Sequence, residues 1–233
     1  MMLRAIVLSC LSALACSGAH AIESTRVRAE NGELHYTGPV DAGANRRLFA
    51  LYDSLEHKPT RMVITSKGGE VSSGLELGQW VHAHRLDLRV PEYCLSSCAN
   101  YVFTAAARKS VASSAVVGFH GGASSTEFKL DDATQAMFDA LGKEQQDAFW
   151  ARFKEDMRPM VEREAAFFRL VGVDRAITTY GQASRFEHTP GDGWTYTQDG
   201  FAHFGVKDIE VSDGPWRPAI AGDAAIFPTL AVD

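Results

Sequence analysis

The chain has 233 residues, of which 45% are hydrophobic and 22% charged, and its formal net charge is −6 at pH 7. Basic residues are interspersed with acidic ones and form no cluster that could follow a phosphate backbone, so the sequence argues against a nucleic-acid partner. No internal repeat, low-complexity tract or long linker divides the chain, and its length suits one domain with a full core.

The first residues have the parts of an export signal. Arg4 precedes an uncharged, mostly apolar run at residues 5–15, and small residues then end in an Ala-x-Ala site at residues 19–21. A run of about eleven residues is too short to cross a bilayer core, which needs roughly twenty. We therefore expect residues 1–21 to be a signal peptide and the mature protein to be periplasmic or secreted, with no membrane span.

Cleavage after the signal would leave 233 − 21 = 212 residues that begin at Ile22, with a net charge of 22 − 29 = −7 because Arg4 is lost. A cut before Cys16 would instead give a lipoprotein. The preceding Ala-Leu-Ala is a poor lipoprotein signal, however, because its large residue stands one position too late. Cleavage after residue 21 would leave two cysteines, Cys94 and Cys98. They would enter an oxidising compartment, where they can form a disulfide.

Beyond the signal, strand and helix patterns alternate, which predicts an α/β domain at residues 22–211 built from βαβ units. A long helical periodicity rich in aromatic residues predicts a helical segment at about residues 130–171. Several prolines predict an irregular tail at residues 212–233. In chain order we expect a strand at 33–36, a helix capped by Asp41, a strand at 61–65, a helix at 71–82, strands at 86–90 and 115–119 flanking a helix at 99–107, a turn at 189–193, a short helix at 197–204 and a strand around Ile209.

Three segments between these elements could carry chemistry. In the first, a buried strand runs into Ser66-Lys67-Gly68-Gly69. A glycine pair lets the backbone bend sharply and lets a substrate approach, so that N–H groups can face a developing oxyanion. A simple strand-to-helix connection would explain the same residues.

The second segment places Ser96 and Ser97 between a strand and an alanine-rich helix. A nucleophile there gains from the positive end of the helix dipole, although either serine could also act only as a helix cap. In the third segment, His120 ends a strand beside two glycines, where active sites of open α/β sheets collect. An imidazole there suits a general base, while a lone histidine is also common as a structural residue.

In this order the segments resemble those of the Clp protease proteolytic subunit and, more broadly, the fold it shares with enoyl-CoA hydratases and signal peptide peptidase A. Residues 66–69 are similar to the Ser-Pro-Gly-Gly of that protease, residues 101–106 to its Phe-Leu-Leu-Thr-Ala-Gly run, and residues 118–120 to the strand that delivers its histidine. Residues 204–208 resemble the Tyr-Gly-Leu-x-Asp that closes its core. The resemblance covers about residues 33–208.

The resemblance is strongest to an exported branch of the Clp-like group, whose members often carry a cysteine on each side of the serine turn. It implies a ClpP/crotonase-like fold of repeated ββα (βαβ) units with additional long helices. It also implies acyl transfer. Aligned on residues 101–106, the nucleophile is Ser97 and not Ser96, His120 is the general base, and the N–H groups of Gly69 and Cys98 hold the oxyanion.

The third member of the implied triad is open. The aspartate of the family falls at Gly193, so a shift of one residue selects Asp192, with Asp199 as an alternative and a dyad without aspartate as another. Lys67 stands where the family has proline and offers a different base, but it precedes the serine and is expected to point to solvent. A Cys98 thiolate would be a different nucleophile, which conflicts with the alignment and with an oxidising compartment.

No metal or other cofactor is expected. His82 and His84 lie two residues apart on a predicted helix and would point about 200° apart. His188 and His203 have no partner at ligand spacing.

The sequence therefore predicts an exported serine hydrolase, in the first instance a peptidase acting on a peptide or protein substrate, and the rings formed by relatives imply a homo-oligomer. A non-catalytic scaffold or binding protein on the same fold is the alternative, with the helices at 130–171 holding a partner or a second copy. Acyl-CoA chemistry shares the oxyanion geometry, but coenzyme A is a cytoplasmic cofactor and this chain is expected to be exported.

Overall fold

The computed structural model describes residues 24–125, 132–189, 191–219 and 227–232. The predicted signal peptide at residues 1–21, including the alternative cut before Cys16, lies outside the described residues. Within the described ranges no helix combines the length and the apolar character that a bilayer crossing requires.

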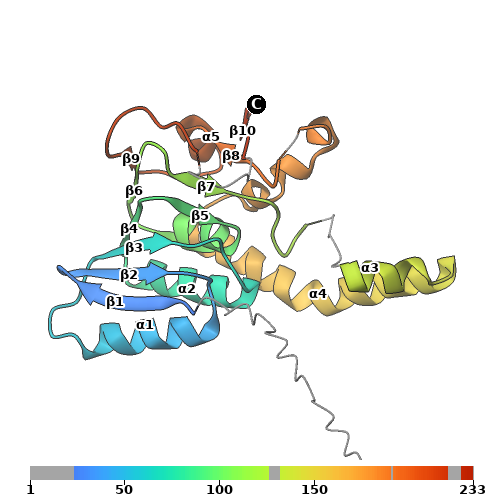
Figure 1. The fold of residues 1–233 in the computed structure, drawn as a ribbon, viewed down its shortest axis with the longest axis horizontal. Coiled ribbons are helices and arrows are strands. Elements are labelled where there is room, and N and C mark those ends of the chain that lie inside the picture. Colours follow the sequence, from blue (N-terminus) through green and yellow to red (C-terminus); the bar gives the residue numbers. More distant parts are fainter. Residues whose placement is uncertain (1–23, 126–131, 190, 220–226, 233) are drawn as a thin grey trace, which may run out of the picture.

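A mixed six-stranded sheet in the order β1-β2-β3-β4-β6-β9 forms the body of the protein (Figure 1). The mixed sheet and the helices beside it confirm the α/β class that the alternating pattern predicted. Neighbouring parallel strands need long crossovers, which helices α1 (Ala42–Ser54) and α2 (Val71–Ala83) provide for the first two parallel pairs. The antiparallel hairpin is β1 (Arg26–Glu30) with β2 (Glu33–Thr37), and the strands parallel to β2 are β3 (Arg61–Thr65), β4 (Asp87–Val90), β6 (Lys109–Val111) and β9 (Ile209–Val211).

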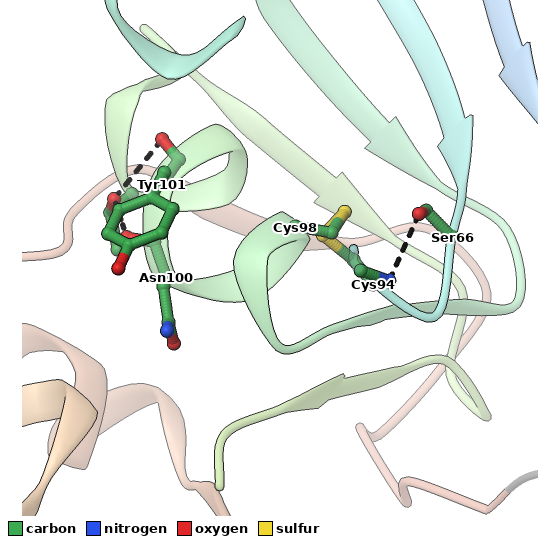
Figure 2. The surroundings of a disulfide bond; sticks show 7 residues. Ser66, Cys94, Cys98, Asn100 and Tyr101 are labelled. Atoms are coloured by element: carbon green, nitrogen blue, oxygen red, sulfur yellow. Dashed lines mark hydrogen bonds between the residues drawn. A yellow bond between two sulfur atoms is a disulfide. The ribbon is translucent and has the colours of Figure 1, made fainter. Parts of the chain in front are cut away.

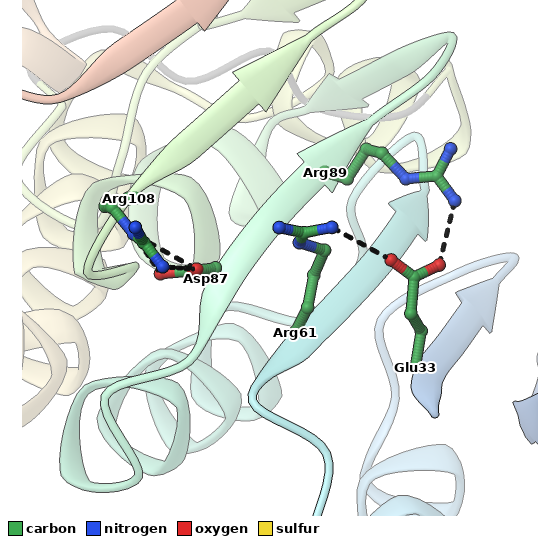
Figure 3. Close-up of polar contacts among 5 residues, drawn as sticks. All are labelled: Glu33, Arg61, Asp87, Arg89 and Arg108. Atoms are coloured by element: carbon green, nitrogen blue, oxygen red, sulfur yellow. Dashed lines mark hydrogen bonds and ion pairs between the residues drawn. The ribbon is translucent and has the colours of Figure 1, made fainter. Parts of the chain in front are cut away.

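The register of the main sheet separates an apolar face from a charged one. Leu34 lies beside Met62, and Met62 beside Leu88, and all three are buried in a core shared with α1 and α2. On the other face, Glu33 pairs with Arg61 at 3.3 Å and with Arg89 at 3.0 Å (Figure 3). Burial acts to raise the pKa of Glu33, but the hydrogen bonds from Arg89 and Arg61 hold that pKa below its usual value.

A second, smaller layer of strand pairing branches from the end of β3. Strand β5 (Tyr93–Leu95) pairs in parallel with β7 (Val116–Gly118), and β8 (Thr195–Tyr196) pairs in parallel with β10 (Thr229–Leu230). Isolated bridges from Ser66 to Cys94 and from Phe119 to Trp194 connect these pairs to β3 and to each other. Strand β10 lies within residues 212–233, so that segment is not irregular throughout.

The predicted helix at residues 99–107 takes an unusual form. Its first part, η1 (Cys98–Phe103), is a π-helix. The predicted short helix after residue 197 is α5 (Gln198–His203), which Thr197 caps through a hydrogen bond from Gly200 N at 3.1 Å. Three 3-10 helices connect α4 to β8: η2 (Arg175–Thr178), η3 (Tyr180–Gln182) and η4 (Ser184–Phe186).

The predicted helical segment at 130–171 contains two helices, α3 (Asp132–Asp139) and α4 (Lys143–Val171). Helix α3 lies along the outer half of α4, and both project from the body (Figure 1). No residue of α3 is buried, and the buried residues of α4 are confined to Glu164, Phe167 and Phe168 near its inner end. Only the inner end of α4 therefore belongs to the core.

Lys109 on β6 is a buried ammonium group whose charge opposes folding. Its side chain is 6% exposed, and its Nζ donates to the carbonyl of Lys207 at 3.1 Å. Burial lowers the pKa of Lys109 from 10.5 to about 8, against the opposing attraction of Asp208. Between these two values the unfolded chain binds a proton that the folded chain does not, so stability rises with pH through this window and the penalty is complete below pH 8.

Lys109→Met is therefore expected to raise the free energy of unfolding at pH 7 by about 2 kcal/mol, which is the ionisation penalty of roughly 3 kcal/mol less the lost hydrogen bond. It should also flatten the rise in stability between pH 8 and 10.5. Urea denaturation across this range measures both effects. Lys207→Met, at an exposed lysine, is the matched control, and a pH dependence in Lys109→Met equal to that of the wild type would contradict the assignment.

Candidate active site

Three turns meet at one edge of the second layer of strands because the strands that precede them are parallel neighbours. Leu95 N donates to Ser66 O at 2.9 Å, and Ser96 N donates to Gly118 O at 2.9 Å. The carboxyl ends of parallel strands share an edge, so the turns that follow them lie together. The structure thus brings together the glycine turn, the serine turn and His120, as the sequence predicted.

Ser96 occupies the centre of the serine turn in a strained conformation. Its φ of 54° is in the left-handed region, which costs a residue with a Cβ atom about 1 kcal/mol or more. Its Oγ lies 2.8 Å from His120 Nε2. Ser96 is partly exposed and His120 is exposed, so a substrate can reach both groups. A serine held in a sharp turn with its hydroxyl on an imidazole has the geometry of an activated nucleophile.

Ser97, the predicted nucleophile, lies in a different environment. It is 1% exposed, and its Oγ donates to the carbonyl of Gly69 at 2.8 Å. It packs against α2, where a Cβ atom added to Gly74 would lie 2.8 Å from Ser97 Cβ. The hydrogen bond to His120 that the sequence led us to expect from Ser97 is made by Ser96 instead.

The two serines occupy different positions at the start of the π-helix. The prediction of Ser97 rested on aligning residues 101–106 with the run that follows the serine in the Clp protease, and this alignment does not depend on the form of the helix. A π-helix closes hydrogen bonds over one more residue than an α-helix. Here η1 begins at Cys98, directly after the two serines, so that Ser97 is its buried N-cap residue and Ser96 lies in the turn before it.

The glycine turn packs directly against the serine turn. Ser66 Oγ accepts a hydrogen bond from Gly68 N at 3.1 Å, and Gly68 has a φ of 91°. Val40 pairs with one side of this turn, since Val40 N donates to Gly68 O at 2.8 Å and Glu70 N donates to Val40 O at 3.1 Å. Pairing of this kind leaves the N–H and C=O of Gly69 on the other side, toward the serines.

Gly68→Ala is expected to destabilise the fold by about 3 kcal/mol, because the residue has a positive φ and no space for a side chain. The added Cβ would lie 2.6 Å from Ser96 Cβ and 2.7 Å from Leu95 O. Gly32→Ala is the matched control, since it has a φ of 75° but nothing within 4 Å of the added atom, and it should cost about 1 kcal/mol. Chemical denaturation compares the two, and equal losses would argue against close contact between the turns.

A disulfide brackets the serine turn. Cys94 in the middle of β5 and Cys98 at the start of η1 are joined by an S–S bond of 2.01 Å, and both are fully buried. Figure 2 shows this bond beside Ser66, with Asn100 and Tyr101 on the helix that follows. The predicted disulfide is confirmed. A thiolate nucleophile at Cys98 is contradicted, since its sulfur is already bonded.

The predicted third residue, Asp192, lies next to the histidine loop in the strand pairing. Phe119 N donates to Trp194 O at 2.8 Å and Trp194 N donates to Phe119 O at 2.7 Å. In this antiparallel register the residues just before Trp194 run beside those just after Phe119, which places Asp192 near His120. Asp199 lies instead in the first turn of α5. Lys67 is exposed, as expected, and its Nζ lies 6.0 Å from the centroid of the Tyr93 ring.

Two residues that were not among the predicted site residues, Asn100 and Glu164, contact the loop after His120. Asn100 Nδ2 donates to Gly121 O at 2.7 Å. Glu164 accepts a hydrogen bond from Ala123 N at 2.9 Å and another from the Tyr101 hydroxyl at 2.7 Å. The sequence did contain a signal for Glu164. This charged residue precedes Phe167 and Phe168 by three and four positions, so it lies on the same apolar helix face.

No family model matches the chain, and a search of curated proteins finds no match to it. Among the described residues, no group of three or more His, Cys, Asp or Glu side chains is arranged to hold a metal ion.

Proposed function

We propose that this protein is an exported serine hydrolase in which Ser96 is the nucleophile and His120 the general base. The observation that supports this most directly is the 2.8 Å contact between Ser96 Oγ and His120 Nε2 at an accessible turn. The left-handed backbone of Ser96 adds support, because strain of this kind is retained where a side chain must be presented. The proposal keeps the base that the sequence suggested and moves the nucleophile by one residue.

The chemistry would be acyl transfer. Ser96 Oγ attacks the carbonyl carbon of the substrate as its proton passes to His120 Nε2, and the carbonyl oxygen becomes an oxyanion. The N–H groups of Gly69 and of Ser97, the residue after the nucleophile, would stabilise that charge. His120 then gives the proton to the leaving group, and water releases the acyl group from Ser96 by the reverse sequence.

Asp192 is proposed as the carboxylate that orients His120, because the pairing of Phe119 with Trp194 brings it beside the histidine loop. The expected role of Cys98 N–H in the oxyanion hole followed from Ser97 as the nucleophile. With Ser96 in that role, the amide of Ser97 takes its place. This amide is close to the glycine turn, since a Cβ atom added to Gly68 would lie 2.9 Å from Ser97 N.

We also propose that the chain belongs to the Clp-protease and crotonase superfamily, with a peptide or protein substrate. Its support is the order of the glycine, serine and histidine segments together with a second layer of strands that continues from the ends of the first. Export to the periplasm or outside the cell is proposed from the signal-like N-terminus. The disulfide between Cys94 and Cys98 agrees with such a compartment.

Labelling with a fluorophosphonate probe tests the proposed function. The purified protein is expected to form one covalent adduct, which peptide mass spectrometry should assign to Ser96. An adduct at Ser97 would restore the nucleophile expected from the sequence. Complete lack of reaction by folded protein, or modification only at serines elsewhere, would reject the hydrolase proposal.

The projecting helices favour self-association, which both the hydrolase and the alternative scaffold function would use. Phe138, Phe149, Trp150 and Phe153 contact one another there but stay only partly buried, and Met137 beside them is 73% exposed. Basic and acidic side chains alternate around them, as in the ion pair of Arg152 with Asp156 at 3.7 Å. A surface that carries both charges can pair with the same surface of a second copy.

We therefore expect an oligomer in light scattering, and Trp150→Glu is expected to shift it toward the monomer. Glu144→Gln, at an exposed position on the same helix, serves as the control. A wild-type protein that is monomeric at high micromolar concentration would contradict this. An oligomer that no probe labels would support the scaffold function over the hydrolase.

A further inference from the structure

The carboxylate of Glu164 is buried without a charged partner. Its side chain is 0% exposed, and among the ion pairs of the described residues none includes it. Its oxygens instead accept hydrogen bonds from neutral donors: the Tyr101 hydroxyl at 2.7 Å, Ala123 N at 2.9 Å and Ser124 N at 2.9 Å. A buried charge is costly to retain, so a residue of this kind points to a requirement other than stability.

Two of these donors belong to the loop that carries His120. Residues 121–125 follow the histidine directly, and Glu164 binds two successive amides of this loop, one with each oxygen. The contact is tight, because a Cβ atom added to Gly122 would lie 2.5 Å from Glu164 Oε1. Ser125 closes the loop by accepting from Gly122 N at 2.9 Å and from Gln182 Nε2 at 3.2 Å.

The third donor belongs to the helix that follows Ser96. Tyr101 lies on η1, next to Asn100, whose Nδ2 donates to Gly121 O at 2.7 Å. Burial raises the pKa of Tyr101, and the Glu164 carboxylate raises it further, so the phenol stays protonated and donates. Asn100 N in turn donates to Ser96 O at 2.8 Å. Glu164 thus connects the helix of the proposed nucleophile with the loop of the proposed base.

We infer that Glu164 is a positioning residue that holds His120 at hydrogen-bonding distance from Ser96. The inference deepens the proposed function and rests on it. Catalytic groups must be held to within about half an ångström, and a surface loop with a glycine pair has little rigidity of its own. The two amide contacts to Glu164 supply that rigidity, which the exposed His120 ring does not obtain from burial.

The test compares labelling kinetics in Glu164→Gln and wild type, with the limiting rate separated from the probe concentration that gives half that rate. An amide has one acceptor oxygen, so one loop N–H loses its partner. The limiting rate is expected to fall by about tenfold to a hundredfold with little change in the half-saturating concentration, because probe binding does not require His120. Glu162→Gln, exposed on the same helix, is the matched control and should react like the wild type.

Gly122→Ala provides a second variant that leaves the carboxylate intact but pushes the loop away from it. It is expected to lower the limiting rate to a similar extent, and it decides the matter if Glu164→Gln does not fold by circular dichroism. Gly142→Ala, where the nearest atom to the added Cβ is 3.8 Å away, is its control. Wild-type limiting rates in folded Glu164→Gln or Gly122→Ala would overturn the positioning role, whereas an unreactive wild type would reject the hydrolase itself.

Discussion

Ser96→Ala is expected to lower fluorophosphonate labelling by at least about a thousandfold, while Ser97→Ala keeps a rate close to that of the wild type. The reason is that, of these two adjacent serines, Ser96 is the accessible one and its hydroxyl is hydrogen-bonded to His120. The Ser97 hydroxyl donates to Gly69 O, so its loss should cost about 1 kcal/mol of stability without removing the reacting atom. Probe fluorescence on gels, at matched concentrations of folded protein, measures both rates.

Ser96→Gly separates loss of function from loss of structure. Glycine adopts the left-handed backbone of this position without strain. The variant should therefore unfold at the same urea concentration as the wild type or at a higher one, although it no longer reacts. Labelling that persists in Ser96→Gly would show that the nucleophile is misassigned. Loss of labelling in Ser97→Ala would show the same.

His120→Ala is expected to slow labelling by about a hundredfold to ten-thousandfold, because the serine hydroxyl then loses the group that takes its proton. The fold should be unaffected, since the His120 ring is exposed and the anchors of its loop are on other residues. His203→Ala, at an exposed histidine on α5, controls for the general effect of removing an imidazole. Unfolding in urea checks that both variants keep the stability of the wild type.

Rescue by free imidazole tests whether His120→Ala reacts slowly because its imidazole group is missing. Added free imidazole should restore part of the rate in His120→Ala and none in Ser96→Ala, because the surface position of His120 leaves room for a small base. If His120→Ala reacts as fast as the wild type, the contact between Ser96 and His120 is structural and the proposed mechanism fails.

The strand and helix patterns, together with the resemblance to the Clp protease, predicted which turns would meet. The glycine turn and His120 each follow a strand with a strong apolar pattern, and such strands pair in parallel when crossovers separate them. The shared edge of β5, β7 and the end of β3 follows from that pairing. Strands β1, β5, β6, β8 and β10 were not predicted, because their residues show no clear apolar pattern and their pairing depends on partners elsewhere in the fold.

By itself, then, the sequence determined the α/β class and the cysteine pair that forms the disulfide, because each depends on residues close together in the chain. It also indicated the three turns and the histidine that the fold brings together. The tertiary structure decided which of two adjacent serines faces His120, since Ser96 lies in the exposed turn while Ser97 is buried and donates to Gly69 O. It also decided that Glu164 binds the histidine loop, because a buried carboxylate is satisfied by amides some 40 residues away that no local pattern can identify.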